Sequence, residues 1–260
     1  MPFSPLWREV LRRKAPVVKV LDVRSDTANA TTYTFTAVGL GDLGSVASTA
    51  GDVYGANPHI RSPGRKAIVV VVHGEDDLAT FGVNSVTIGG VAGTEKVDRG
   101  GGSTAINTAI YVWDAASLGG ITGTDVVVTW SEGVTNCAIG VLAIDNLGIL
   151  ADAVASANSA VGSGEIALSP SPNMLDTNSV LIVGSSKLNA GAGELFIIRS
   201  GSGGGMQPTI LYDGAHAEGR FAAAWTYRPQ HAAAGDTQAF PVAVSWTGAG
   251  SFDVACIGLI

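Results

Sequence analysis

The sequence predicts an all-β protein, an antiparallel β-sandwich of jelly-roll type with a short α-helix at its N-terminus. From residue 17 onward, segments rich in Val, Ile, Thr and aromatic residues alternate with turns rich in Gly, Asp, Asn and Pro, a pattern typical of strands. No clear helical pattern separates most of these segments, which favours antiparallel pairing over βαβ units. Glycine, at 35 of 260 residues, is close to twice its usual share of about 7% and suits tight turns.

The first sixteen residues have a helical pattern instead. Ser4 suits an N-cap, Pro5 suits the first helical position, and Pro16 ends the helix. A short amphipathic helix is marginal alone, so it needs a partner surface, either the protein's own body or another protein of an assembly. A membrane or nucleic acid is the least favoured partner, because four apolar residues make a weak membrane anchor. We assign partner docking to its apolar stripe and neighbouring bases, Leu6, Trp7, Arg8, Val10, Leu11, Arg12 and Arg13.

The strands that we expect follow in chain order. Each combines β-branched or aromatic residues with a turn signal at one or both ends. Their ranges are 17–23, 31–38, 66–74, 84–93, 104–114, 124–131, 136–144, 178–186, 193–200, 220–228, 239–246 and 252–260.

The predicted body, residues 20–260, divides into two related halves, about 20–145 and 165–260, behind a docking arm of residues 1–19. Residues 124–144 and 239–260 both contain a strand ending in Trp, a Gly-bearing turn, and a strand with Cys and Ile-Gly. The likeness indicates two stacked β units or, as the preferred interpretation, one sandwich built from related hairpins. Residues 147–160 are interpreted as a crossing segment.

Charge is scarce and unevenly distributed. Charged residues make up 14% of the chain, and 22 Asp and Glu against 15 Lys and Arg give a net charge of −7. Residues 1–19 hold five bases and one acid (+4), which leaves −11 on residues 20–260. The acidic total argues against binding to nucleic acid, and no apolar run reaches the ~18 residues of a membrane span. The scarcity of charge favours either a subunit packed against neighbours or a monomer with long Gly, Ser and Ala loops.

The sequence predicts no cofactor and no metal site. Residues 39–44 match the dinucleotide pattern G-x-G-x-x-G, but a Gly- and Pro-rich loop follows where a helix is needed. His73 precedes Glu75, Asp76 and Asp77, a group that suggests a cation site but is interpreted as a solvated turn. Two cysteines, Cys137 and Cys256, are too few for a zinc site; buried free thiols are preferred to a disulfide between them.

The aromatic and acidic residues allow a carbohydrate function. Four tryptophans near strand ends would stack on sugar rings if exposed, but the preferred interpretation places them in the core. A glycosidase needs two facing carboxylates, about 5–9.5 Å apart, and spacing along the chain shows no such pair. The tryptophans are Trp113, Trp130, Trp225 and Trp246, and the candidate acids are Glu132, Asp145, Asp213 and Glu218. We therefore expect no enzymatic activity.

The segments 30–42, 65–76, 84–97, 104–115 and 124–144, followed by a looser second round, resemble virion proteins of tailed phages that infect proteobacteria. The resemblance implies a β-sandwich subunit on the exterior of the particle, located in the virion as a fibre, spike or decoration protein. It implies other virion proteins as partners and a homo-oligomer, with a trimer among the forms it allows. No catalytic residue comes with it.

The function we expect is that of a non-enzymatic virion structural protein, anchored by its N-terminal segment. One alternative is a host-receptor-binding adhesin that recognises a surface glycan, through loop aromatics or the Gly-rich loop at 199–208. A second alternative is a glycosidase that degrades capsule. The sequence favours the structural role, because its loops contain little Tyr, Trp and Arg, the residues that dominate recognition hot spots.

Overall fold

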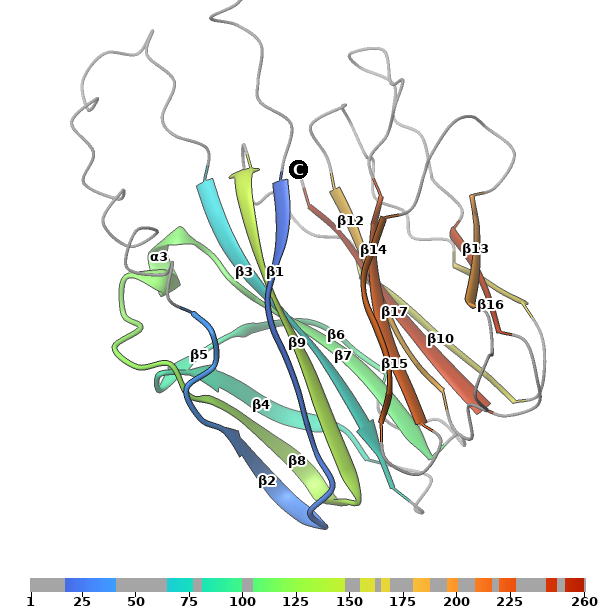
Figure 1. Cartoon of the computed structure of the whole chain (residues 1–260), viewed down its shortest axis with the longest axis horizontal. Helices are drawn as coiled ribbons and strands as arrows, with labels where there is room; N and C mark the ends of the chain where they lie inside the picture. The colour runs from blue at the N-terminus through green and yellow to red at the C-terminus, as the bar shows by residue number, and fades with distance from the viewer. Residues whose placement is uncertain are drawn as a thin grey trace, which may run out of the picture.

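The computed structural model describes residues 17–40, 65–76, 81–99, 105–147, 155–161, 165–168, 180–187, 196–200, 209–216, 220–227, 242–246 and 251–259. These residues form four β-sheets and one helical turn, α3 (Ala115–Leu118), and all strand pairings are antiparallel (Figure 1). The predicted all-β antiparallel fold is confirmed. Within the described ranges, no helix is long and apolar enough to cross a membrane. The predicted N-terminal helix lies outside them.

Residues 17–147 form two of the sheets. Sheet A has the order β1 (Val17–Asp26), β9 (Asn136–Leu147), β3 (Arg65–Glu75), β7 (Ile106–Trp113), β6 (Thr94–Asp98). Sheet B has the order β2 (Ala30–Phe35), β8 (Val126–Val134), β4 (Val83–Ile88), β5 (Val91–Ala92).

Residues 155–259 form the other two sheets. Sheet C has the order β10 (Ala155–Val161), β17 (Ser251–Leu259), β12 (Val180–Lys187), β15 (Arg220–Tyr227), β14 (Thr209–His216). Sheet D has the order β11 (Glu165–Leu168), β16 (Val242–Trp246), β13 (Phe196–Ser200). Among the described strands, none of one half joins a sheet of the other.

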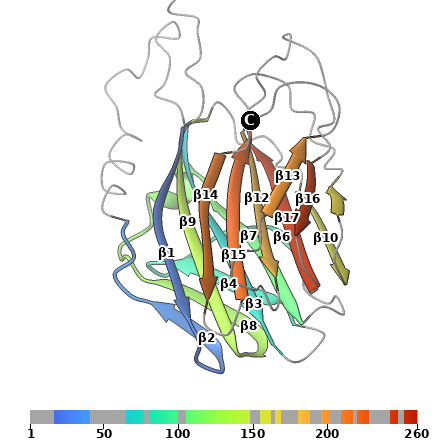
Figure 2. The ribbon, with the colours of Figure 1, turned by 45° about the vertical axis from the view of Figure 1, so that its right-hand side comes forward.

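The sheets are stacked in layers, with sheet A between sheets B and C and sheet D beyond sheet C (Figures 1 and 2). Successive side chains of a strand point to opposite faces, so β3 sends Ile68, Val70 and Val72 toward sheet B and Val69 and Val71 toward sheet C. A strand in the middle layer must therefore be apolar on both faces. All eight residues of β7 are buried for this reason.

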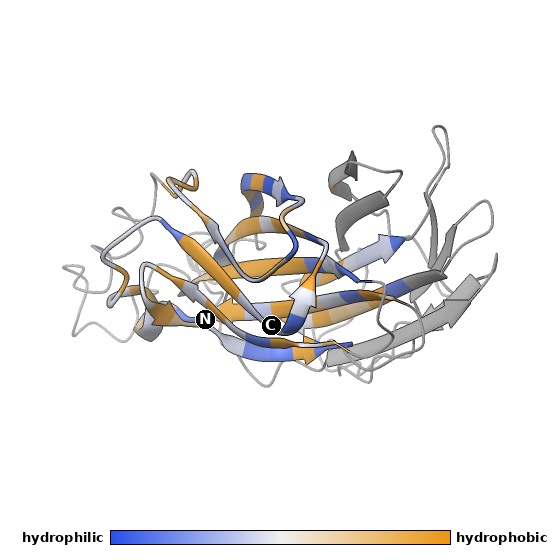
Figure 3. Cartoon of the chain, turned by 90° about the horizontal axis from the view of Figure 1, so that it is seen from below, coloured by the Kyte–Doolittle hydropathy of each residue, from blue (hydrophilic) through white to orange (hydrophobic). Residues whose placement is uncertain are grey.

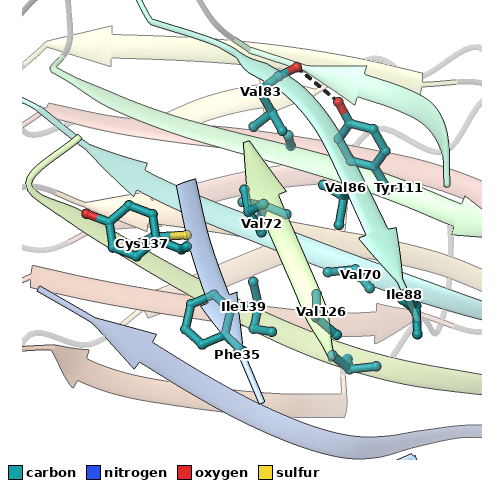
Figure 4. Packing of buried hydrophobic residues seen from close by; sticks show 14 of the residues in the cluster. Phe35, Val70, Val72, Val83, Val86, Ile88, Tyr111, Val126, Cys137 and Ile139 are labelled. Atoms are coloured by element: carbon teal, nitrogen blue, oxygen red, sulfur yellow. Dashed lines mark hydrogen bonds between the residues drawn. The ribbon is translucent and has the colours of Figure 1, made fainter. Parts of the chain in front are cut away.

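The core between sheets A and B contains the large aromatic residues. Figure 4 shows part of it, with Phe35 and Val126 from sheet B packed against Val70 and Ile139 from sheet A. The Tyr111 hydroxyl donates a hydrogen bond to the Val83 carbonyl oxygen at 3.1 Å, which ties the two sheets together. Apolar residues run along the stacked strands, whereas hydrophilic residues gather at many strand ends (Figure 3).

The strand orders of the two halves correspond. Reading along sheet C, strands β10, β17, β12, β15 and β14 occupy the places that β1, β9, β3, β7 and β6 occupy in sheet A. Sheet D repeats the β2–β8–β4 part of sheet B with β11, β16 and β13. The segments that look alike in the sequence, 124–144 and 239–260, contain the corresponding pairs β8–β9 and β16–β17.

Sheets A and C face each other with their strand orders reversed. Strand β3 lies on β12, β7 on β17, β1 on β14, and β6 on β10. Two copies related by a two-fold axis would show the same reversal, because such an interface uses one surface twice. The interface between the halves thus has the form of an isologous dimer interface inside one chain.

The sequence-based strand assignments need three corrections. Residues 84–93 form a hairpin, β4 and β5, because Gly89 (φ +52°) and Gly90 (φ +83°) supply the two positive φ angles of a tight turn. Part of the crossing segment 147–160 belongs to strand β10. Three further strands, β6, β11 and β14, were not expected.

Candidate functional site

The predicted docking residues lie outside the described residues. These are Leu6, Trp7, Arg8, Val10, Leu11, Arg12 and Arg13, and the structure neither brings them together nor separates them. The described chain begins at Val17, the first residue of β1. The surface next to the docking segment in the sequence is therefore the edge of sheet A.

Strand β1 is the most exposed strand of sheet A, and no described strand pairs with its outer edge. Val17, Val20 and Val23 are 37–39% exposed and are the exposed large apolar residues of the described chain. Val20 pairs with Leu142, and Val23 pairs with Gly140, which is also the partner of Val71. Because Leu142 and Val71 belong to the core between sheets A and C, Val20 and Val23 lie on that face.

The apolar strip on β1 starts under sheet C. Val18, on the same face as Val20, packs with Leu211 of β14 against the core between sheets A and C. Beyond this contact Val20 and Val23 extend the apolar surface into solvent. We call Val18, Val20 and Val23 the β1 strip.

Asp22 fixes the position of β1. Its Oδ2 accepts hydrogen bonds from the Gly39 amide at 2.9 Å and the Arg24 Nε at 2.9 Å, and its Oδ1 accepts one from the Val23 amide at 2.8 Å. Partial burial raises the pKa of Asp22, but these hydrogen bonds and the Arg24 charge together hold the pKa below its ordinary value. The strand irregularity at residues 20–22 places this carboxylate at the edge.

His73 is buried, so its interpretation as part of a solvated turn is wrong. Its side chain is 4% exposed and faces sheet C, where Nδ1 lies 2.8 Å from the Ser186 hydroxyl of β12. The same hydroxyl lies 2.7 Å from Thr108 Oγ1 and donates to the Asn107 carbonyl oxygen at 3.3 Å. This polar network links the two halves in the interior.

Charged side chains surround this end of the interface. Glu75 and Asp76 are buried, although the sequence placed them in a solvated turn. Lys187 and Asp253 of sheet C are buried as well. Buried charges need polar or charged partners, and each of these four side chains makes at least one such interaction. Within the described residues, no group of three His, Cys, Asp or Glu side chains has the arrangement of a metal site.

Two of the four tryptophans belong to the core, as preferred from the sequence. Trp113 and Trp130 are at most 1% exposed; Trp113 Nε1 donates to the Val91 carbonyl oxygen at 3.0 Å. Trp130 packs against Phe81, with ring centroids 5.6 Å apart. The side chains of Trp225 and Trp246 lie outside the described part.

Both cysteines are buried thiols, and neither is part of a disulfide, as preferred from the sequence. Burial raises the pKa of the Cys137 thiol, and the adjacent Trp130 only partly offsets this effect. Such a thiol is inert at neutral pH, since the thiolate is the reactive form.

The described candidate acids do not form a glycosidase pair. Glu132 is near the end of β8 and Asp145 is near the far end of β9. Strand β9 begins at Asn136, four residues after Glu132, and Asp145 lies nine positions further along it, which is about 30 Å in an extended strand. The two acids are therefore too far apart to act as a pair. The side chains of Asp213 and Glu218 lie outside the described part.

Sequence reasoning missed two features, the β1 strip and the polar network on His73. The sequence of residues 17–23 does contain a signal for the strip. The charged residues Lys19 and Asp22 lie among the valines, and charged residues of this kind are typical of edge strands. The network has no such signal, because Ser186 is 113 positions after His73. No protein-family model matches the chain, and no curated protein matches it significantly.

Proposed function

We propose that this protein is a non-enzymatic structural protein of a phage virion, exposed on the particle exterior and anchored by its N-terminal segment. The resemblance of its sequence to virion proteins suggested this function. The order of the strands is the structural observation that carries the proposal.

We further propose that each half is a jelly roll. In that fold, two four-stranded sheets contain the eight strands in the orders 1-8-3-6 and 2-7-4-5. Sheet A without its edge strand β6 follows the first order as β1-β9-β3-β7, and sheet B follows the second as β2-β8-β4-β5. Jelly rolls are common in viral capsid proteins and lectins, which supports a virion protein by analogy of fold.

The surface chemistry agrees with a subunit that packs against neighbours. Only 14% of the residues are charged, and charge is depleted at the centres of protein interfaces. The proposed anchor carries +4 within residues 1–19, opposite in sign to the body. Complementary charge of this kind speeds encounter between subunits.

The described chemistry supports a role without catalysis. The imidazole of His73 lies beside the Ser186 hydroxyl, a pair of groups that could take part in acid–base chemistry. Both residues are only 4% exposed, because they are buried where sheets A and C meet. A substrate could reach them only if the halves separated. Their position fits a structural role.

The second candidate is an adhesin that binds a host-surface glycan. The observation that favours it is the same strand order, because lectins also use the jelly roll. The two candidates predict different locations on the particle. An adhesin belongs at the tip of the tail or baseplate, and a scaffold or decoration protein belongs along the tail or over the head.

Immunogold electron microscopy of purified particles tests the proposal, with antibody raised against residues 20–260. The proposal predicts label on intact particles. Label at the tail tip would favour the adhesin, to be followed by glycan-array binding, and label along the tail or head would favour the scaffold. Intact particles without label, from a preparation that contains the protein by mass spectrometry, would contradict exposure on the exterior.

The anchor is tested separately. Particles grown with a variant carrying Trp7→Asp and Leu11→Asp should incorporate less protein than wild type, because the apolar stripe is interrupted by charge. Quantitative mass spectrometry of purified particles measures the incorporation. Unchanged incorporation would contradict an N-terminal anchor and leave the exterior location intact.

A further inference from the structure

We propose that the β1 strip receives the N-terminal segment of a second copy of this chain, so that the protein associates with itself by exchange of its N-terminal arms. This inference deepens the proposed function, since it rests on the N-terminal segment as the docking element and names its partner.

The strip is an apolar surface that the described part of the chain leaves uncovered. Val20 and Val23 are 39% and 38% exposed, while the neighbouring residue on the same face, Val18, is packed under sheet C. Val20 and Val23 are three residues apart, so the uncovered part of the strip is about 10 Å long. Val20 and Val23 are neighbours on one face of β1, so together they form a small continuous apolar surface that adjoins the core between sheets A and C.

The predicted helix of residues 5–14 has complementary size and chemistry. Ten helical residues are about 15 Å long, which is enough to cover both Val20 and Val23. Leu6, Trp7, Val10 and Leu11 form one apolar stripe, and an aromatic anchor on an amphipathic helix is a common element of recognition. The bases beside that stripe favour a body with a net charge of −11.

The chain connection indicates that the strip belongs to another copy. Val17 is already paired with Asp145 in the β1–β9 ladder, and the Lys19 ammonium forms a salt bridge with the Asp145 carboxylate at 3.6 Å. Only Ala15 and Pro16 separate the predicted helix from this fixed strand. A residue before proline prefers extended conformations, and proline is disfavoured at the third position of a type I turn. From these preferences we expect the segment to lead away from its own β1 rather than to fold back onto it.

Reciprocal exchange closes the assembly. If the arm of one copy covers the strip of a second copy, the arm of the second can cover the strip of the first, which gives a two-fold dimer. The same contact made head to tail gives a ring, a form that the predicted oligomer also allows. Both forms require each arm to contact a strip in another copy.

Disulfide trapping on the full-length protein tests the contact. Leu11→Cys and Val23→Cys variants are purified separately, mixed in equal amounts and oxidised mildly. The native Cys137 and Cys256 are buried, at 1% and 0% exposure, and do not compete. We expect a covalent dimer, with mass spectrometry identifying a peptide in which the thiol introduced at position 11 of one chain is joined to the thiol introduced at position 23 of the other.

The matched control replaces Val23→Cys by Arg24→Cys. Arg24 is the next residue of the same strand, half-exposed, and it pairs with Ile139 on the face toward sheet B. We expect several-fold less heterodimer with Arg24→Cys than with Val23→Cys. Equal yields would overturn the assignment of the contact to the strip.

Two further results would also overturn the proposal. In the double variant Leu11→Cys/Val23→Cys, a disulfide within one chain and none between chains would place the arm on its own strip. Sedimentation should give assemblies for wild type and monomers of 26.3 kDa for Val20→Asp/Val23→Asp. A wild-type monomer would contradict self-association. All of these measurements use purified protein and test only self-association. A negative result here can therefore be told apart from a negative result in the immunogold experiment, which tests the location on the particle.

Discussion

The two faces of sheet A bury different kinds of side chain. Toward sheet B the core contains large aromatic residues, among them Trp113, Trp130 and Tyr33, and each tryptophan ring covers a glycine. Toward sheet C it contains mainly Val, Ile, Leu and Ala, and Gly184 lets the two sheets approach closely. The second face then ends in the polar network of His73, Thr108 and Ser186.

This difference shows that the two faces of sheet A have different structural roles. The face toward sheet B holds a sandwich together, and its stability depends on filling the volume of large rings. The face toward sheet C joins two sandwiches of corresponding strand order, and it depends on close fit and on hydrogen bonds that fix the register. Loss of ring volume should therefore be most damaging on the first face, and loss of close fit or of a hydrogen bond between the sheets should be most damaging on the second.

The largest effect is expected from Trp130→Ala. Trp130 is 1% exposed, and truncation of such a ring leaves a cavity that costs about 3–5 kcal/mol of unfolding free energy. Urea unfolding followed by circular dichroism measures the loss. A loss below about 1 kcal/mol, in the range of a surface substitution, would contradict the role of this ring in the core.

Gly74 provides a paired test of the same face. A Cβ at Gly74 would lie 2.2 Å from the Trp130 ring, so Gly74→Ala should destabilise the wild type. In the Trp130→Ala background the same change should cost much less, because the obstructing ring is gone. Additive losses in the double variant would show that the two residues do not touch.

On the face toward sheet C, Gly184→Val should cost about 1–3 kcal/mol by overpacking. A Cβ there would lie 2.5 Å from Val71 Cγ1 and 3.2 Å from Thr108 Cγ2. The control is Gly119→Ala, since Gly119 has φ −63° and its Cβ would meet only the Ala116 carbonyl oxygen, at 3.7 Å. Equal urea midpoints for the two variants would contradict close packing of the halves.

Ser186→Ala should have a smaller effect, about 1 kcal/mol, because it removes one buried hydroxyl from the network without adding volume. Thr108→Val removes the hydroxyl that lies 2.7 Å from it. A double-mutant cycle on these two variants measures their coupling. Zero coupling would show that the two halves are not joined through this contact.

The smallest effect is expected at the edge strand. The pKa of Asp22 is lowered in the folded state, so this carboxylate stabilises the fold above its unfolded pKa near 3.8, and the contribution disappears as the pH falls through the lower folded value. Wild type should exceed Asp22→Asn in stability by about 1 kcal/mol or less at pH 7. The difference should shrink below pH 3.8. A difference that grows on acidification would contradict the direction of the shift.

The sequence predicted those strands whose own residues are strongly β-forming. Strand β7 and the valine run of β3 were recognised because both faces of the middle sheet select apolar residues. Strand β6 (TEKVD) was missed because charge dominates its composition, and β10 (ASANSAV) because its residues are small. Pairing with neighbouring strands, rather than intrinsic preference, makes these segments strands.

The burial of His73 could not be predicted, for a related reason. The sequence around it, His-Gly-Glu-Asp, has the composition of an exposed turn. Sheet C covers this residue, and the contact comes from Ser186 in the other half of the chain. Likewise, the exposure of Val20 depends on how far sheet C extends over β1. Local patterns contain neither fact.

A designed disulfide between β3 and β12 tests whether sheet A is stacked on sheet C. A Cβ at Gly184 would lie 3.8 Å from Val71 Cβ, about the mean spacing in disulfides. Val71→Cys/Gly184→Cys, folded under oxidising conditions, should therefore form one bond within the chain, found as a joined peptide by mass spectrometry. Val70→Cys/Gly184→Cys, with residue 70 facing sheet B, should leave both new thiols free. Free thiols in the first variant, or equal bonding in both, would contradict the stacking.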